Sequence, residues 1–309
     1  TYDHQVQNNT VILPGGDAAV LRIKGTDRGI AVTTDGNGRY CYLDPRAGAA
    51  IAVAEAARNI VATGARPAAV SDCLNFGNPE KPEVFWELKE SIEGMADACR
   101  QMDLPVVSGN VSLYNDTSGV SIYPSPVVGM VGVIDDIDKR VSAGFREEGD
   151  AVLLVGQTQD DLGGSEFLKT CVGRVAGRPP ALDMEVEKRA HEAILNAADE
   201  RLLQSCHDLS DGGLAVAVAE SAFIGGIGVA CDSVDRLGLD LTVALFSESQ
   251  SRFLVSCRPR DVGAFESLCK RQQVPAQRIG TVGGELIALG ERVSLPLAEA
   301  RELWENALR

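Results

Sequence analysis

The sequence predicts an α/β protein made of two domains that join near residue 140. Its 309 residues exceed the roughly 100–200 residues of one typical domain, and 45% of them are hydrophobic, which is enough for two cores. A charged, turn-rich stretch at 135–150 separates two successive series of apolar strands and helices. We therefore expect one domain at 1–137 and a second at 138–309.

In the first domain, apolar runs bounded by turn residues predict three strands, and helical spacing predicts two helices. One helix covers 48–63 and ends before Gly64, a residue type favoured at helix C-caps. The other covers 82–102 and carries an apolar stripe on one face. The stripe consists of Phe85, Leu88, Ile92, Met95, Cys99 and Met102. The strands are 29–34, 105–107 and 126–134.

In the second domain the same signals predict further strands and helices. The strands are 151–155 and 252–257, and the helices are 184–200 and 214–223. Glycines lead into two helix starts, at 163–166 and 210–214. They leave backbone N–H groups open to an anion, but helix capping alone explains most of this pattern. We expect the polar segment 246–252 to be a solvated loop, and His4 and His191 to be ordinary surface residues.

Composition argues against two classes of partner. The chain carries a net charge of −15 and no basic stripe, so we expect no nucleic-acid binding. No apolar run reaches about 20 residues and no signal-peptide pattern occurs, so we expect no membrane span and a cytoplasmic location. The opening residues, Thr1-Tyr2-Asp3, lack an initiator Met, which indicates an engineered or processed fragment. Eight cysteines stand without a C-x-x-C pair, as expected of buried free thiols.

Four polar segments of the first domain each follow a predicted strand or form a turn. They contain Asp17, Asp35 with Asn37, Asp72, and Asn110 with Ser112. Carboxylate and amide oxygens at neighbouring strand ends are typical Mg²⁺ ligands, and the glycines among them let backbone N–H groups approach a phosphate. One segment alone fits a plain turn, but four together favour a nucleotide–Mg²⁺ site. Neither a Walker A loop nor a Rossmann fingerprint occurs, so ATP would bind in another way.

Three segments carry a specific resemblance: LNFGNPEKPE at 74–83, SGNVSLYN at 108–115 and FSESQSR at 246–252. Together with HDLSDGGL at 207–214, and in this order, they resemble the second half of small-type phosphoribosylformylglycinamidine synthases. The resemblance covers essentially the whole chain. It implies an enzyme of two halves, each similar to aminoimidazole ribonucleotide synthetase. In each half the first-domain sheet pairs with its counterpart into a barrel, and the second domain is an α/β sandwich.

The resemblance also implies an activity, cofactors and partners. Enzymes of this family use ATP and Mg²⁺ to convert formylglycinamide ribonucleotide to its amidine in purine biosynthesis. Ammonia comes from glutamine through a separate glutaminase subunit and a small bridging subunit. ATP phosphorylates the amide oxygen, and ammonia attacks the resulting iminophosphate. Phosphoryl transfer depends on positioning and charge neutralisation, which agrees with the polar segments of the first domain.

Four residues receive roles from motifs that match the family. Asp72 and Gly109 match positions that contact ATP. Asn110 matches a Mg²⁺ ligand, and Ser112 matches a position that contacts the substrate.

Three further residues, Asp17, Asp35 and Asn37, fall in the nucleotide and metal region of the superfamily. The family's catalytic histidine belongs to an H-N-H-P-type motif of the first half, and this chain has no such motif. Most of the Mg²⁺ carboxylates also belong to the first half. We therefore expect no catalytic residue in this chain and no amidine formation by the chain alone.

Two other functions remain open. A stand-alone ATP-using synthetase or kinase of the same superfamily would need its own general base and full metal set, which the sequence does not show. A non-catalytic module that binds a nucleotide structurally would keep it without hydrolysis. We also expect the isolated chain to be a homodimer, because a first-domain sheet without its barrel partner would bury apolar surface against a second copy.

Overall fold

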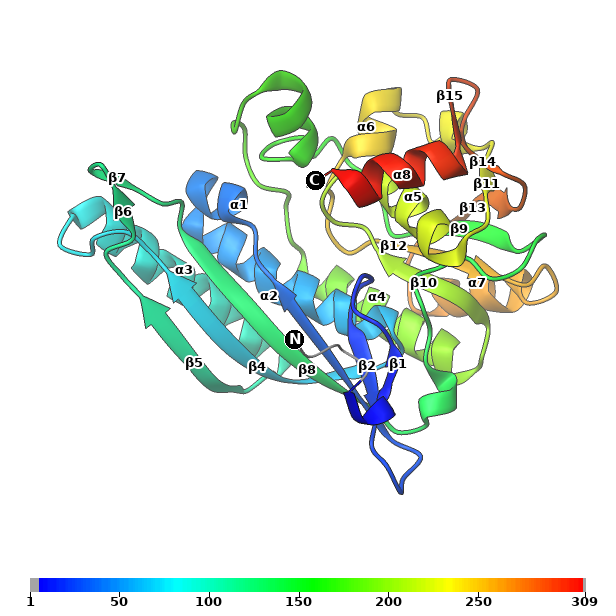
Figure 1. The fold of residues 1–309 in the computed structure, drawn as a ribbon, viewed down its shortest axis with the longest axis horizontal. Coiled ribbons are helices and arrows are strands. Elements are labelled where there is room, and N and C mark those ends of the chain that lie inside the picture. The colour runs from blue at the N-terminus through cyan, green and yellow to red at the C-terminus, as the bar shows by residue number, and fades with distance from the viewer. Residues whose placement is uncertain (1–5, 308–309) are drawn as a thin grey trace.

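The structure is a computed structural model that describes residues 6–307. It contains two large sheets, each with helices packed against it, and one small hairpin (Figure 1). The predicted α/β class and the presence of two domains are confirmed.

The first sheet has six strands in the order β1-β2-β3-β8-β4-β5. Only β4 and β5 pair in parallel. Neither large sheet formed by residues 6–307 closes on itself, so a single chain contains an open sheet and not the barrel that the family implies. The strands are β1 (Thr10–Ile12), β2 (Ala19–Arg22), β3 (Gly29–Asp35), β4 (Arg66–Asn75), β5 (Val106–Ser112) and β8 (Ser125–Ile134), and the hairpin is β6 (Asp116–Thr117) and β7 (Val120–Ser121).

Two long helices cover one face of this sheet. Helix α2 (Pro45–Ala62) begins earlier than predicted, because Pro45 occupies its first turn and the Asp44 side chain caps it. It ends before Gly64, whose φ of +82° allows the tight turn, as predicted. Helix α3 (Pro82–Met102) has the predicted bounds.

The apolar stripe predicted for α3 is partly wrong. Met95 and Cys99 are buried as expected, but Phe85 and Ile92 are exposed. Because α3 packs against α2 as well as against the sheet, small residues occupy part of its buried face. Its buried residues are Val84, Ser91, Gly94, Met95, Ala98 and Cys99.

The opposite face of the first sheet is not covered by any helix. Val32, Val131 and Val133 lie on it and are each 39–40% exposed. Strand β5 is the edge strand, and residues 106–111 are all exposed. The uncovered face of the first sheet is therefore an open, apolar surface.

The second sheet has seven strands in the order β10-β12-β9-β13-β11-β14-β15 and contains one parallel pair, β11 with β14. The strands and helices predicted here are present, with ends within two residues of those expected. The strands are β9 (Ala151–Val155), β10 (Leu203–Asp208), β11 (Val229–Cys231), β12 (Phe253–Cys257), β13 (Ala276–Val282), β14 (Leu286–Leu289) and β15 (Val293–Pro296). The helices are α4 (Met184–Asp199), α5 (Gly213–Gly225), α6 (Leu241–Phe246), α7 (Val262–Arg271) and α8 (Leu297–Asn306).

The two domains share buried contacts. Leu182 and Met184, just before and at the start of α4, pack into the first-domain core. Six of the eight cysteines are buried as expected, whereas Cys73 is half-buried and Cys171 is exposed. Within residues 6–307, no helix has both the length and the apolar character needed to cross a membrane.

Candidate functional site

The predicted site residues gather at one end of the first sheet. Strands β3, β4 and β5 run in the same direction, because β8 is antiparallel to both β3 and β4 and β5 is parallel to β4. Asp35 and Asp72 both stand opposite Val128, and Asp72 also stands opposite Gly109. Three of the predicted residues thus form one cross-strand row.

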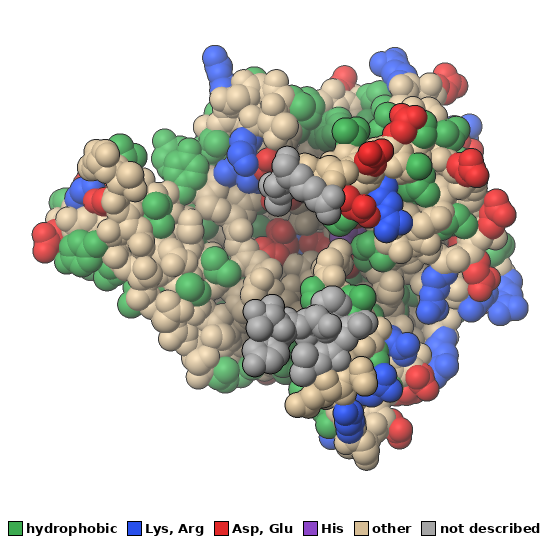
Figure 2. All heavy atoms as spheres, in the orientation of Figure 1, with side chains coloured by type: hydrophobic (Ala, Val, Ile, Leu, Met, Phe, Trp, Pro, Cys, Tyr) green, Lys and Arg blue, Asp and Glu red, His purple; other side chains and the backbone are tan. Residues whose placement is uncertain are grey.

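A cavity of about 460 Å³ opens beside Asp17 and Asp35, between the two domains. Figure 2 shows a hollow near the middle of the molecule with acidic side chains and a histidine at its floor. The polar side chains that line the cavity are Asp17, Thr33, Thr34, Asp35, Glu55, Asn59, His207, Ser210 and Glu220. Acidic groups from both domains therefore face one space.

Asp17 connects the glycine turn of the first domain to strand β10 of the second. Its Oδ1 lies 2.8 Å from His207 Nδ1 and accepts a hydrogen bond of 2.8 Å from the backbone N–H of Asp208. The other ring nitrogen of His207 lies 3.1 Å from Glu220 Oε2. Burial disfavours the imidazolium ion, but Asp17 and Glu220 together raise the pKa of His207 well above its usual value. The predicted residue Asp17 therefore forms a charged contact between the domains.

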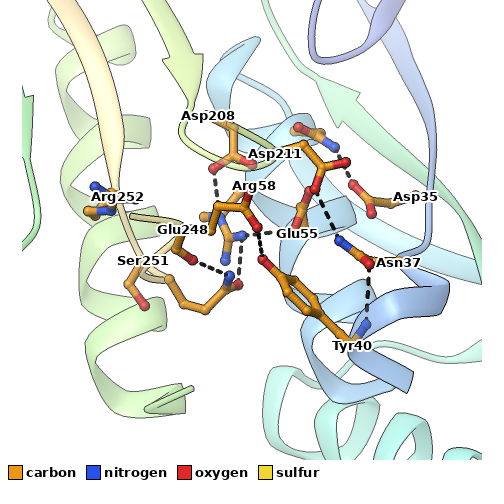
Figure 3. Close-up of polar contacts among 12 residues, drawn as sticks. Asp35, Asn37, Tyr40, Glu55, Arg58, Asp208, Asp211, Glu248, Ser251 and Arg252 are labelled. Atoms are coloured by element: carbon orange, nitrogen blue, oxygen red, sulfur yellow. Dashed lines mark hydrogen bonds and ion pairs between the residues drawn. The ribbon is translucent and has the colours of Figure 1, made fainter. Parts of the chain in front are cut away.

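Arg58 of α2 lies at the centre of a buried ionic network (Figure 3). Its Nε donates to Asp208 Oδ1 at 2.7 Å and its Nη1 to Glu187 Oε1 at 3.0 Å. Nη2 donates to Gln250 Oε1 at 2.9 Å. Burial disfavours the guanidinium charge, but these carboxylates outweigh it and raise the pKa of Arg58. The network joins α2 to three segments of the second domain.

Three carboxyl groups influence one another beside Arg58: Asp35, Glu55 and Asp208 (Figure 3). Burial and the charge of Asp208 raise the pKa of Asp35 to about 7. Burial and the charge of Asp35 raise the pKa of Glu55. Burial raises the pKa of Asp208 to about 6, although the charge of Arg58 opposes this rise. Asn59 Nδ2 donates to Asp35 Oδ2 at 2.8 Å, but the buried Oδ2 of Asp208 has no hydrogen-bond partner.

Repelling carboxylates with an unpaired oxygen are a donor set that suits a hard divalent cation. Across the described part of the chain, however, no three His, Cys, Asp or Glu side chains are grouped so that they could hold a metal by themselves. A Mg²⁺ ion here would need further oxygens from Asn59, water or a phosphate. The residues therefore fit a cation that binds together with a phosphorylated ligand.

Asn37 serves a structural purpose at the start of helix α1 (Gly38–Leu43). Its Oδ1 accepts hydrogen bonds from the backbone N–H groups of Arg39 and Tyr40 at 3.1 and 3.3 Å, so it is the N-cap. Its Nδ2 donates to Asp211 Oδ1 at 3.0 Å, and Arg39 also pairs with Asp211 at 2.8 Å. Because the Asn37 side chain already makes these contacts within the protein, its predicted role at the nucleotide would come only from its position beside the cavity.

The helix starts that the sequence leaves open to an anion are occupied by the protein itself. Glu248 accepts hydrogen bonds of 2.8 Å from the backbone N–H groups of both Gly212 and Glu166, and a third from the Tyr40 hydroxyl. The segment 246–252 was expected to be a solvated loop, which is wrong, since its members from Ser247 to Arg252 are all buried. Their polar groups form hydrogen bonds inside the protein instead of with solvent.

The second group of predicted residues lies on β4 and β5. An added Cβ at Gly109 would lie 2.3 Å from Asp72 Oδ1, so a side chain here would push this carboxylate out of its place. Burial raises the pKa of Asp72. Asn110 is exposed, and Ser112 Oγ lies 3.1 Å from the amide nitrogen of Asn115. Since side chains alternate along a strand, Asn110 and Ser112 lie on the uncovered face and Gly109 on the helix-covered face.

Several residues of the site were missed by the sequence analysis. Glu55, Arg58 and Asn59 lie in α2, where charged residues between alanines were the available signal. His191 was expected at the surface, which is wrong: it is buried, with Nε2 2.9 Å from Glu187 Oε1. Both belong to α4, and Glu187 also accepts a hydrogen bond from Arg58 at 3.0 Å. His4 lies outside the described residues.

Comparison with known families identifies both domains. Residues 15–134 match the N-terminal domain of AIR synthase related proteins, and residues 147–288 match their C-terminal domain.

Similar proteins and structures extend this result. The PurL subunits of phosphoribosylformylglycinamidine synthase from Caldanaerobacter subterraneus and Alkaliphilus metalliredigens are each 50% identical over 312 aligned residues, covering 100% of this chain but 42% of their own length. The fold resembles T. maritima PurL complexed with FGAR, with a TM-score of 0.79, 23% identity, and coverage of 93% of this chain and 48% of that one. T. maritima PurL complexed with ATP gives a TM-score of 0.75 at 21% identity, covering 92% and 46%. Both domains of this chain therefore belong to the AIR synthase related family, and the chain is homologous to the PurL subunit.

Proposed function

We propose that this chain is the second half of a small-type phosphoribosylformylglycinamidine synthase, which converts formylglycinamide ribonucleotide to its amidine with ATP and Mg²⁺. The relatives support this, because they are PurL subunits that match this chain throughout, whereas the chain spans 42% of their length. The observation that carries the proposal is the position of four motif residues towards the ends of the paired strands β4 and β5. They are Asp72, Gly109, Asn110 and Ser112.

Each of the four residues offers chemistry that suits its role. Asp72 and Gly109 contact ATP, whose phosphoryl group activates the substrate amide; the absence of a side chain at Gly109 leaves backbone accessible beside the carboxylate. Asn110 presents an exposed amide oxygen to Mg²⁺. Ser112 presents a hydroxyl group to the substrate. The residues bind and orient, and none of them transfers a proton.

The remaining part of the active site belongs to the missing half. Strand β5 is an uncovered edge and the sheet has one open face, so a ligand at its end would contact the protein from one side only. We infer that the other half supplies the second wall and the catalytic histidine, and pairs its sheet with this one into the barrel. Further partners would be a glutaminase subunit and a small bridging subunit. The chain alone then forms no amidine.

A second nucleotide–cation site, without catalysis, is favoured by the cavity between the domains. Asp35 lines this cavity and has a raised pKa. The pKa of the nearby Asp208 is also raised, and its buried Oδ2 has no partner. Asp17 and Asn37 would fix the walls of this site. We also place the domain boundary at residues 137 and 138, in the segment that leads from β8 to β9.

Calorimetry of Mg²⁺-dependent ATP binding tests the proposal. We would compare the native chain with Asp72→Ala, Asn110→Ala and Asp35→Asn, and with Asp160→Ala as a control at an exposed carboxylate. If only Asp72→Ala and Asn110→Ala lose ATP binding, the result supports the strand ends as the ATP site. If only Asp35→Asn loses binding, the nucleotide lies in the cavity between the domains.

Absence of binding by the native chain would mean that the ATP site needs the missing half, in which case the same variants are measured in the joined enzyme. Binding that survives all three substitutions would contradict both sites.

A further inference from the structure

Tyr114 has a backbone conformation that its side chain disfavours. Its φ is +60°, a value that glycine adopts freely and a bulky residue rarely does. It is the only aromatic residue with a positive φ among the described residues. Its ring is 58% exposed, so core packing does not explain why a tyrosine occupies this position.

Hydrogen bonds to the segment directly after β4 hold this conformation in place. The backbone N–H of Tyr114 donates to the carbonyl O of Gly77 at 2.9 Å, and that of Asn115 donates to Phe76 at 3.2 Å. The Asn115 side chain donates to the carbonyl groups of Phe76 and Ser112, both at 3.0 Å. Backbone and side-chain hydrogen bonds therefore fix this turn.

The position of this ring places it beside the proposed substrate contact. Tyr114 follows Ser112 by two residues, directly after strand β5 and before the β6–β7 hairpin at the far end of the sheet (Figure 1). Its only polar side-chain contact among residues 6–307 is a long one, 3.4 Å from the hydroxyl to Glu80 Oε1. More than half of the surface of Tyr114 is exposed, so a ligand can reach this residue. Strained residues that are held by their surroundings occur preferentially at ligand-binding sites.

We propose that Tyr114 is a substrate-contacting residue that determines specificity for the sugar of the ribonucleotide bound at Ser112. This inference rests on the proposed function. The aromatic face packs against the apolar face of the ribose, while Ser112 meets a polar group of the same molecule. The hydroxyl of Tyr114 stays with Glu80 and contributes little to binding.

The test uses the complete enzyme, in which this chain is joined to the first half, and measures KM separately for formylglycinamide ribonucleotide and ATP. Tyr114→Gly should raise KM for the ribonucleotide about tenfold, the effect of losing one aromatic contact, and leave KM for ATP unchanged. Tyr114→Phe should behave like the native enzyme. The melting temperature of Tyr114→Gly should not fall, because glycine tolerates the positive φ.

Ser118→Gly is the matched control. Ser118 also has a positive φ, of +52°, and lies at the exposed tip of the β6–β7 hairpin. It should leave both KM values unchanged. Equal effects of Ser118→Gly and Tyr114→Gly on KM for the ribonucleotide would overturn the inference. Both substitutions would then act through the shape of the hairpin and not through a contact with the substrate.

Ser112→Ala separates this inference from the function on which it rests. If it raises KM for the ribonucleotide while Tyr114→Gly does not, only the role of Tyr114 is overturned. If neither variant changes KM, the substrate does not lie at this end of the sheet, and the proposed site itself is wrong.

Discussion

Arg58 shows how much a single buried charge can depend on its partners. Its side chain is fully buried and pairs with Asp208 and Glu187 from two elements of the second domain. Removing the guanidinium group would leave these carboxylates buried without a counter-charge. The free-energy cost of such a loss exceeds that of any exposed ion pair in the molecule.

We expect Arg58→Met to lower the free energy of unfolding by about 3–5 kcal/mol, as measured by urea denaturation. Arg66→Met is the matched control, because Arg66 also pairs with a residue of α4, Glu192 at 2.9 Å, but both side chains are about half exposed. Its effect should stay below about 1 kcal/mol. Equal effects of the two substitutions would show that the buried network is not stabilising.

Asp35 should make stability depend on pH. Its pKa rises from 3.8 to about 7 in the folded protein, so the folded state binds this proton more tightly than the unfolded state. The stabilising contribution is complete below pH 3.8 and is lost as the pH rises towards 7. Asp35→Asn resembles the protonated form, so its stability relative to the native chain should increase with pH over this window. Thermal melts from pH 4 to 8 check this, with Asp160→Asn as a control substitution at an exposed carboxylate.

The site residues differ in how far the sequence could identify them. Asp35 and Asp72 follow strands of one direction, so their common edge could be inferred from local patterns. The ion pair between Asp208 and Arg58 could not be predicted, because 150 positions separate the two residues and only tertiary packing brings them together. His191 looked like a surface residue because its burial depends on tertiary packing, although its partner Glu187 lies one turn away on the same helix.

Between elements, the contact of α2 with α3 depends on one glycine. An added Cβ at Gly94 would lie 2.1 Å from the carbonyl O of Arg46, so the helices would have to separate. Gly94→Ala should therefore lower the free energy of unfolding by about 1–3 kcal/mol. Gly263→Ala in α7 is the control with the opposite sign, because nothing lies within 4 Å of its added Cβ. Alanine there should stabilise the helix by about 0.5–1 kcal/mol, and denaturant titrations of both variants decide the matter.

The contact between α2 and α3 explains why the ends of helices could be predicted from the sequence but the buried face of α3 could not. Helix bounds followed from proline, glycine and capping residues, which act locally, and α3 has the predicted ends. The buried face of α3 was predicted from side-chain size, and this failed at Phe85 and Ile92 because the neighbouring helix favours small residues at the contact. The segment 246–252 failed similarly: its polar groups are satisfied by the protein, which polarity alone cannot reveal.

For the whole molecule, the open face of the first sheet predicts self-association. Val32, Val131 and Val133 form an exposed apolar surface on a sheet whose edge strand β5 is unpaired, and a sheet with such an edge readily pairs with another. In the proposed enzyme the first half would cover it. Without that half, a second copy offers the same complementary surface through two-fold symmetry.

We therefore expect the isolated chain to be a dimer by light scattering, and a double substitution, Val131→Lys with Val133→Lys, to make it a monomer. Two lysines on a buried sheet face would be desolvated without partners, which opposes pairing. Val172→Lys is the control, since Val172 is equally apolar and exposed but lies in the second domain. A native chain that is already monomeric would refute the prediction, and a dimer that survives the double substitution would place the interface elsewhere. A native dimer that separates only in the sheet variant would identify the open sheet face as the surface that pairs with another sheet.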